Sequence, residues 1–416
     1  MFGLQESFDR EIKEMCAPAR LGLKLIENRL EEMGLFLTWR QRRNLRKRLD
    51  ASNGDELEFN FSDKQVANSK FASEDELQKA FADFVDRLCN DLEEFQKGFG
   101  DGLSDSFEAI TESAADNINA SLKKKARRAS RDQSQRQHKF SKATIRTWGD
   151  ALALMQGLIS ISDEAAEAYF NRSDDYTEDD DLCDALVRIH AKASTVAKEI
   201  LLLLLNGFSD GAHARWRTLH ELAVTAAFLS QYGNSAARQY IDHHAVEMFK
   251  AAREYNRHYS KFGAEEISPE EIAELECRYN ELIKEYGSDF RHDYGWASIC
   301  LNKNKPTFRD IEAAVEMDYS RLEYKEASAN VHANPSGVFL RLGLLPEDEI
   351  ILYGPSILGL AQPAIATINA FTVISTSLLT HGANIDCLVV CKVMLRFASH
   401  AKEAFVAVEE SLGRQE

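Results

Sequence analysis

Proline and glycine are scarce in this sequence of 416 residues, which contains only 7 prolines and 21 glycines. Folds built from many short strands need these residues at their turns, so the scarcity argues against a β-sandwich or a β-barrel. Hydrophobic residues make up 44% of the chain and charged residues 28%, as in ordinary globular proteins. The composition therefore excludes a wholly disordered chain, and the length suits two domains.

Cysteine patterns are also missing, because the seven cysteines are scattered and form no CxxC pair. An odd, dispersed set fits neither a disulfide framework nor a zinc ribbon. Cys387 and Cys391 lie one helical turn apart, but the apolar stretch "CLVVC" around them indicates a buried core. A glycine-rich phosphate loop and a Ser-His-Asp set are absent as well, so we expect no metal and no other cofactor.

Positive charge is in deficit, since the formal net charge is −17. A protein that coats nucleic acid through its overall charge is therefore excluded. The exception is the segment 123–146, "KKKARRASRDQSQRQHKFSKATIR", which holds ten Lys or Arg residues and one acid, Asp132. A solvated helix face or linker is one interpretation, and a contact with RNA or an acidic partner is the other.

Charged residues are absent between residues 350 and 385, which raises the question of a membrane span. A span needs roughly 20 predominantly apolar residues. This run instead carries Gln362, Pro363 and Asn369, so "PAIATINAFTVISTSLL" is predicted to be a buried core helix, with no membrane contact. The charged start "MFGLQESFDREIKEM" is unlike a signal peptide, and we expect a cytoplasmic protein.

Helical periodicity dominates the rest of the chain, with apolar residues at helical spacing in 5–34, 74–98, 144–170 and 182–208. A turn with the sequence "NGFSDG" joins the last of these segments to "AHARWRTLHELAVTAAFLSQYG", which predicts an antiparallel helical hairpin. Only "ELEFNFSD" (56–63) alternates as one short strand would. The predicted fold is all-α, a multi-helix array of antiparallel helical hairpins with a separate N-terminal helical region.

The domains that we expect are residues 1–135, which end in the basic segment, and residues 136–405, a C-terminal helical domain. Within the second domain, "ARWRTLHELA" contains Arg215 and His220 in an Arg-x4-His spacing. A helix advances about 100° per residue, so these two side chains point about 140° apart and do not form one phosphate site. Arg217 and Glu221, by contrast, share a face and are predicted to pair.

Three blocks in the second domain resemble an uncharacterised bacterial all-helical family, a domain of unknown function. They are "GFSDGAHARWRTLHELAVTAAFL", "YGWA" (294–297) and "YKEASANVHANPSG" (324–337), and the resemblance covers about residues 136–400. The family's Arg-x3-Glu pattern falls on Arg217 and Glu221.

The third block usually reads Tyr-Arg-x6-His in that family, and here it is Tyr324, Lys325 and His332. This corner is similar to the active site of HEPN-type ribonucleases (higher eukaryotes and prokaryotes nucleotide-binding). The resemblance implies a metal-independent RNA-cleaving effector, in phage defence or as a toxin, that acts as a homodimer. His332 would move a proton, Lys325 and Arg217 would hold phosphate, and Glu221 would orient one of these cations. Lys325 departs from the family's arginine, because lysine keeps the charge but loses the bidentate fork.

Two further residues complete the predicted site as substrate-binding groups, Asn334 after the histidine and Trp296 in "YGWA". A second interpretation makes Trp296 a core anchor. Pro335 predicts that the preceding helix ends near His332, where the negative end of the helix dipole favours a protonated imidazole. The rival hypothesis for the whole chain is a non-catalytic helical binding or scaffold protein whose Arg-Glu-His cluster is structural.

Overall fold

The computed structural model describes residues 18–51, 59–67, 69–71, 74–171, 180–332, 334–339, 341–344 and 351–413. Every regular element within these ranges is a helix, which confirms the all-α prediction. The predicted strand at 56–63 is wrong over its described part. Residues 59–62 are irregular, and helix α4 (Asp63–Ala67) begins at Asp63; residues 56–58 lie outside the described residues.

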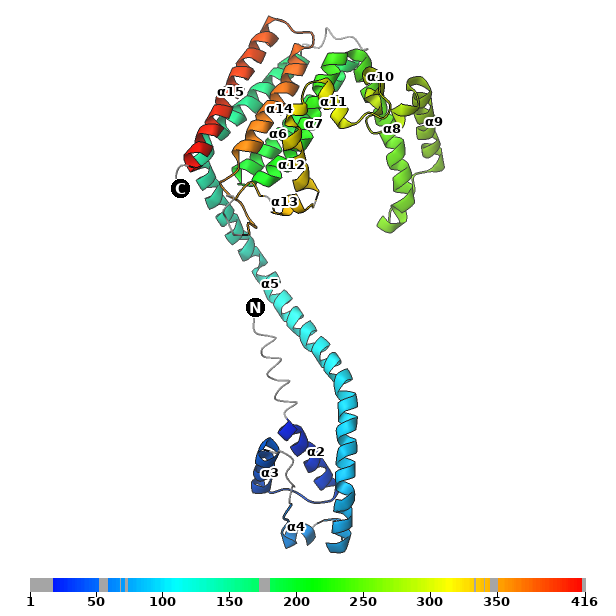
Figure 1. Ribbon diagram of the computed structural model, residues 1–416, viewed down its shortest axis with the longest axis vertical. Helices are drawn as coiled ribbons and strands as arrows, with labels where there is room; N and C mark the ends of the chain where they lie inside the picture. Colours follow the sequence, from blue (N-terminus) through cyan, green and yellow to red (C-terminus); the bar gives the residue numbers. More distant parts are fainter. Residues whose placement is uncertain are drawn as a thin grey trace. The chain divides into compact units, whose positions relative to one another are not determined.

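Contacts divide the chain into two compact units, Met1–Arg127 and Arg128–Glu416. The sequence analysis placed the boundary between its two domains after residue 135. The longest helix, α5 (Glu74–Phe170), contributes residues to both units (Figure 1).

The N-terminal unit consists of α2 (Pro18–Glu32), α3 (Trp39–Ala51), α4 and the first part of α5. Its small core gathers Ile26, Leu30, Leu35, Leu45 and Phe84. An ion pair from Arg29 Nε to Asp91 Oδ2, at 2.6 Å, ties α2 to α5. Helical spacing of the apolar residues thus builds a separate core here, as the sequence pattern predicted.

The C-terminal unit contains the remaining helices and the second part of α5 (Figure 1). The longer helices are α6 (Asp181–Leu205), α7 (Ser209–Tyr232), α8 (Asn234–His258), α9 (Pro269–Tyr286), α11 (Phe308–Ala314), α12 (Arg321–Val331), α13 (Pro335–Phe339), α14 (Ala361–Thr380) and α15 (Ile385–Gly413). Short segments join them: η2 (Tyr259–Phe262), η3 (Ser288–Arg291), η4 (Gly295–Ala297), α10 (Ser298–Leu301) and η5 (Asp318–Ser320).

The predicted hairpin is formed by α6 and α7, which pack along each other, and Gly207 makes the turn between them possible. The backbone of Gly207 has φ +75°, a left-handed conformation that side chains other than hydrogen disfavour. A Cβ atom there would also lie 2.7 Å from the carbonyl oxygen of Ser356. Both constraints require glycine at this turn, so the hairpin prediction is confirmed together with its cause.

Helix α14 lies in the middle of the unit and packs against α6, α7 and α15 (Figure 1). Within the described residues it is the one helix long and apolar enough to cross a membrane, and 67% of its apolar window is buried inside the protein. Its Thr367, Thr372 and Ser375 hydroxyls donate to carbonyls one turn earlier in the helix. The predicted burial of this segment is therefore confirmed.

A buried polar chain joins α5, α6 and α14 within this core. The Ser162 hydroxyl lies 2.8 Å from His190 Nε2 and 2.6 Å from the Ser375 hydroxyl. Burial lowers the pKa of His190 to about 4, so the ring is neutral at ordinary pH. Each of these polar groups has a partner, which makes burial of the three affordable and fixes how the helices align.

Candidate functional site

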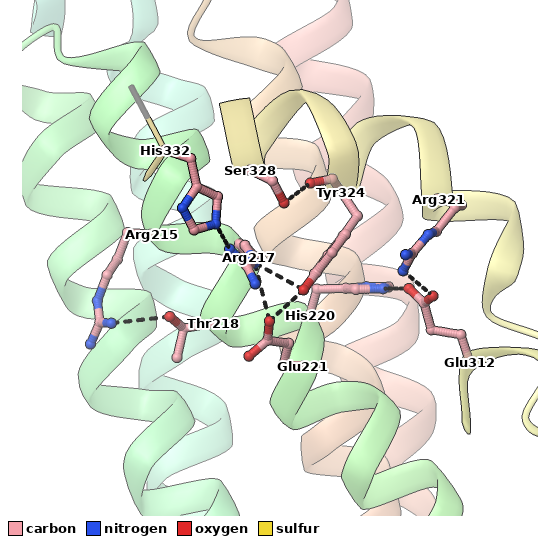
Figure 2. A network of polar contacts seen from close by, with 10 residues as sticks. All are labelled: Arg215, Arg217, Thr218, His220, Glu221, Glu312, Arg321, Tyr324, Ser328 and His332. Carbon is pink, nitrogen blue, oxygen red and sulfur yellow. Dashed lines mark hydrogen bonds and ion pairs between the residues drawn. The ribbon is translucent and has the colours of Figure 1, made fainter. Parts of the chain in front are cut away.

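The candidate site forms where α12 packs against α7 (Figure 2). Arg217 and Glu221 lie one turn apart in α7, with Nε and Oε1 separated by 3.1 Å. Their side chains are 26% and 36% exposed, so the pair is half-buried. The predicted ion pair is confirmed, and it faces the 324–337 segment.

Tyr324 stands at the centre of this cluster and was not among the predicted site residues. Its hydroxyl donates to Glu221 Oε1 at 2.6 Å and accepts from Arg217 Nε at 2.9 Å (Figure 2). Burial and the Glu221 carboxylate raise the pKa of Tyr324, so the phenol keeps the proton that it donates. The Arg217 guanidinium carbon also lies 4.9 Å from the ring centroid, a cation–π contact.

His332 completes the cluster from the end of α12. It is the residue that follows the last helical turn, with extended backbone angles, so the predicted helix end is confirmed. Its Nε2 lies 3.1 Å from Arg217 Nη1, and its side chain is exposed (Figure 2).

The chemistry of this contact determines the state of the imidazole. A guanidinium only donates hydrogen bonds, so His332 Nε2 must accept and the ring proton belongs on Nδ1.

Asn334 uses its side chain locally, as the N-terminal cap of α13. Its Oδ1 accepts from the backbone N–H of Gly337 at 2.9 Å, and Pro335 is the first residue of that helix. Gly337 is needed for close approach, because a Cβ atom there would lie 2.0 Å from the Ala329 carbonyl oxygen. The corner after His332 is therefore held tightly against α12.

Lys325 and Trp296 are not part of the hydrogen-bonded cluster. Lys325 is exposed, because its neighbour Tyr324 points into α7 and the helix turns by about 100° per residue. Trp296 is only 5% exposed and packs edge-on against Phe228 and Tyr240, at 5.4 and 5.1 Å between ring centroids. Trp296 thus has the packing of a core anchor, although it also lines a separate surface pocket of about 510 Å³.

A second polar network lies beside the first and was missed by the sequence analysis. Glu312 is fully buried, accepts from Arg321 Nη1 at 2.6 Å and lies 3.0 Å from His220 Nε2 (Figure 2). The His220 and Tyr324 ring centroids are 5.7 Å apart, so the two networks adjoin. Nothing in the local sequence around Glu312 marks it, since its partners lie 9 and 92 residues away.

Arg215 and His220 point to different sides of α7, as the rotation of about 100° per residue predicted. Arg215 forms an ion pair with Glu199 and bonds Thr218, whereas His220 points into the second network (Figure 2). Among the residues that the structure describes, no group of three or more His, Cys, Asp or Glu side chains is arranged to hold a metal. The chemistry available to the cluster is therefore that of a guanidinium, a carboxylate, a phenol and an imidazole.

Comparison with known proteins adds one finding. Residues 184–350 match a family of unknown function, DUF5677. The expected resemblance to a domain of unknown function is thus confirmed over this range, and the match does not describe the family as HEPN-like. No curated protein and no solved structure matches the chain. The DUF5677 region contains every residue of both polar networks.

Proposed function

We propose that this protein is a HEPN-like, metal-independent ribonuclease of the cytoplasm, acting in phage defence or as a toxin. The observation that carries the proposal is the contact between the exposed His332 imidazole and the Arg217 guanidinium. Phosphodiester cleavage by RNA's own 2′-hydroxyl needs a proton carrier beside a fixed cation. The cluster brings together an exposed imidazole at the end of α12 and a half-buried guanidinium on α7.

Glu221 and Tyr324 hold the cation for this task. They engage Arg217 through its Nε, so that within the cluster the terminal nitrogens contact only His332, through Nη1. A phosphate bound there would take over Nη1 and release the lone pair on His332 Nε2. Substrate binding would thereby turn an occupied imidazole nitrogen into a general base.

The reaction then follows from these groups. His332 Nε2 takes the proton of the 2′-hydroxyl as its oxygen attacks phosphorus, and the bond to the 5′-oxygen breaks. A proton is then returned to that 5′-oxygen. One RNA fragment ends in a 5′-hydroxyl and the other in a 2′,3′-cyclic phosphate. Exposed Lys325 adds positive charge on α12, the helix that ends just before His332. A homodimer would bring two such sites to one RNA molecule.

The test is cleavage of total RNA by purified protein in the presence of EDTA. We expect His332→Ala to abolish cleavage, and Lys325→Arg to preserve or raise it by restoring the bidentate fork. The matched control is His400→Ala, which removes another exposed histidine of the same unit. Equal cleavage by the His332 variant, or none by the unmodified protein, would contradict the proposal.

The second candidate is a non-catalytic helical binding or scaffold protein. It is favoured by the way Arg217, Glu221 and Tyr324 satisfy one another and tie α7 to α12. In that case His332→Ala would alter stability alone. Unfolding measurements on the same variants separate the two candidates, because a purely structural histidine would change the free energy of unfolding without any RNA-dependent readout.

A further inference from the structure

The part of α5 that belongs to the C-terminal unit carries a stripe of positive charge. Five cations repeat at helical spacing along it: Arg128, Arg131, Lys139, Lys142 and Arg146. At 100° per residue they fall within an arc of about 80°. From Arg128 to Arg146 this basic stripe runs roughly 27 Å, at 1.5 Å per residue.

The orientation of the stripe follows from contacts on the other side of the helix. Gln137 and Ser141 both bond Asn206 Oδ1, at 3.0 and 2.9 Å. Thr144 and Trp148 are fully buried, and Trp148 Nε1 donates to the Ile357 carbonyl at 2.8 Å. These residues fix one face of α5 against its own unit, so the basic stripe on the opposite face is exposed.

The charge of the basic stripe is not neutralised within the protein. None of its five cations takes part in an ion pair among the described residues. Asp132 is the one acid in the segment 123–146 of a chain whose net charge is −17. Like charges set side by side repel one another, so such a stripe favours an anionic partner.

The side chains between the cations indicate what kind of anion fits. Of the uncharged residues in this stretch, Gln135 falls within the arc of the cations at 100° per residue, and it is exposed. Hydroxyl and amide groups among lysines and arginines are typical of contacts to phosphate and sugar. A protein partner would need buried aromatic or aliphatic anchors. The arc of the cations holds none, and the exposed Ile145 lies about 100° away from Arg146 around the helix.

We infer that the basic stripe binds the phosphate backbone of nucleic acid without regard to base sequence. The choice of RNA as the natural partner rests on the proposed function; the binding of phosphate does not. A duplex presents one phosphate per 3.4 Å along each strand, so roughly 27 Å of helix spans on the order of eight phosphates. The stripe would hold RNA for the cleaving cluster of the same chain.

The experiment measures binding of a fluorescent 20-nucleotide RNA of mixed sequence by anisotropy, at several salt concentrations. Every protein is full-length and carries His332→Ala, which prevents cleavage. The stripe variant changes Arg128, Arg131, Lys139 and Lys142 to glutamine. The control variant changes four exposed cations elsewhere in the unit to glutamine, namely Arg238, Lys261, Lys284 and Arg309. Both variants lose four positive charges, so only the location differs.

We expect the stripe variant to bind RNA at least tenfold more weakly. The slope of log affinity against log salt concentration should become shallower, by an amount equal to the loss of roughly three phosphate contacts. The control variant should bind within about threefold of the parent. Equal losses in both variants, or tighter binding of polyglutamate than of RNA, would overturn the inference. A DNA oligomer of the same sequence that binds tenfold tighter than the RNA would overturn the assignment to RNA.

This design keeps the two proposals apart. Cleavage that is lost in His332→Ala while RNA binding persists supports both of them. Cleavage with no effect of the stripe variant on binding overturns only the stripe. RNA binding through the stripe by a protein that never cleaves overturns only the ribonuclease.

Discussion

Tyr324 shows at the residue scale why local patterns located only part of the site. Arg217 and Glu221 could be predicted because an i, i+4 pair is local to one helix. Tyr324 is 107 residues from Arg217 in sequence, and no periodicity relates them. The contact of His332 with Arg217, across 115 residues, was expected only through the family resemblance. A separation of 92 residues likewise hid the contact between Glu312 and His220.

The Tyr324 hydroxyl offers a direct test of the cluster. Tyr324→Phe keeps the ring and its cation–π contacts but removes one of the two donors to Glu221 Oε1 and one of the two acceptors of Arg217 Nε. We expect a loss of about 1–3 kcal/mol in the free energy of unfolding, as for a hydrogen bond to a charged group. Urea denaturation measures it.

The matched control is Tyr240→Phe, because the Tyr240 hydroxyl has no hydrogen-bond partner among the described residues. That variant should change stability by less than about 0.5 kcal/mol. If the two substitutions cost the same, the hydrogen bonds of Tyr324 do not stabilise the fold. If Tyr324→Phe also lowers kcat more than it raises KM, the cluster acts on the transition state.

At the scale of secondary-structure elements, some features could be predicted from the sequence and others could not. The ends of α6 and α12 could be predicted, since glycine and proline mark them locally. The strand predicted at 56–63 failed because alternation over a few residues cannot show whether a neighbouring strand exists to pair with. Gly337 serves close packing of α13 on α12, a role that the local sequence does not indicate.

Gly337 therefore provides a test in which two effects have opposite signs. Helix propensity alone would make Gly337→Ala stabilising by about 1 kcal/mol. The Cβ atom would lie 2.0 Å from the Ala329 carbonyl oxygen, and backbone cannot move aside cheaply. We expect the steric effect to win, with a net loss of roughly 1–3 kcal/mol measured by thermal or urea unfolding.

Gly149 in α5 serves as its counterpart. A Cβ atom there meets only the Ile145 side chain, at 3.4 Å, which is ordinary van der Waals contact. Gly149→Ala should thus leave stability unchanged or raise it by up to about 1 kcal/mol. A gain of stability in both variants would show that α13 is free to shift away from α12.

At the scale of the whole molecule, the region that matches DUF5677 shares its hydrophobic core with helices outside that region. Its helices α6 and α7 bury much of their apolar surface against α14, which follows residue 350, and α5 and α15 extend the same core. The chain also separates its charge, with a net of −17 overall and a basic stripe on one helix. Composition and periodicity predicted the helical class. The sharing of one core between the matched region and the helices outside it depends on contacts that are distant in sequence.

Stability of the whole fold should depend on pH through its buried histidines. His213 is fully buried, and neither ring nitrogen has a hydrogen-bond partner among the described residues. Burial lowers the pKa of His213 to about 4, and that of His190 likewise, from an ordinary 6.5. Between pH 6.5 and 4 the unfolded chain therefore binds protons at these rings that the folded protein does not. Stability should fall as pH drops through this window, by about 1.4 kcal/mol per pH unit for each ring.

Replacing His213 isolates this effect. His213→Leu removes a ring that has no polar partner to lose, so the dependence of unfolding free energy on pH should become shallower by about 1.4 kcal/mol per pH unit between 6.5 and 4. The free energy of unfolding of the variant, relative to that of the parent, should therefore be higher at pH 5 than at pH 8. Exposed His400→Leu is the control, because that imidazole lies in solvent in the folded protein, and we expect this variant to leave the slope unchanged. Urea unfolding at a series of pH values measures the free energy of unfolding of all three proteins. If the plots of this free energy against pH are parallel for the parent and His213→Leu, the His213 ring takes up its proton in the folded protein as readily as in the unfolded chain.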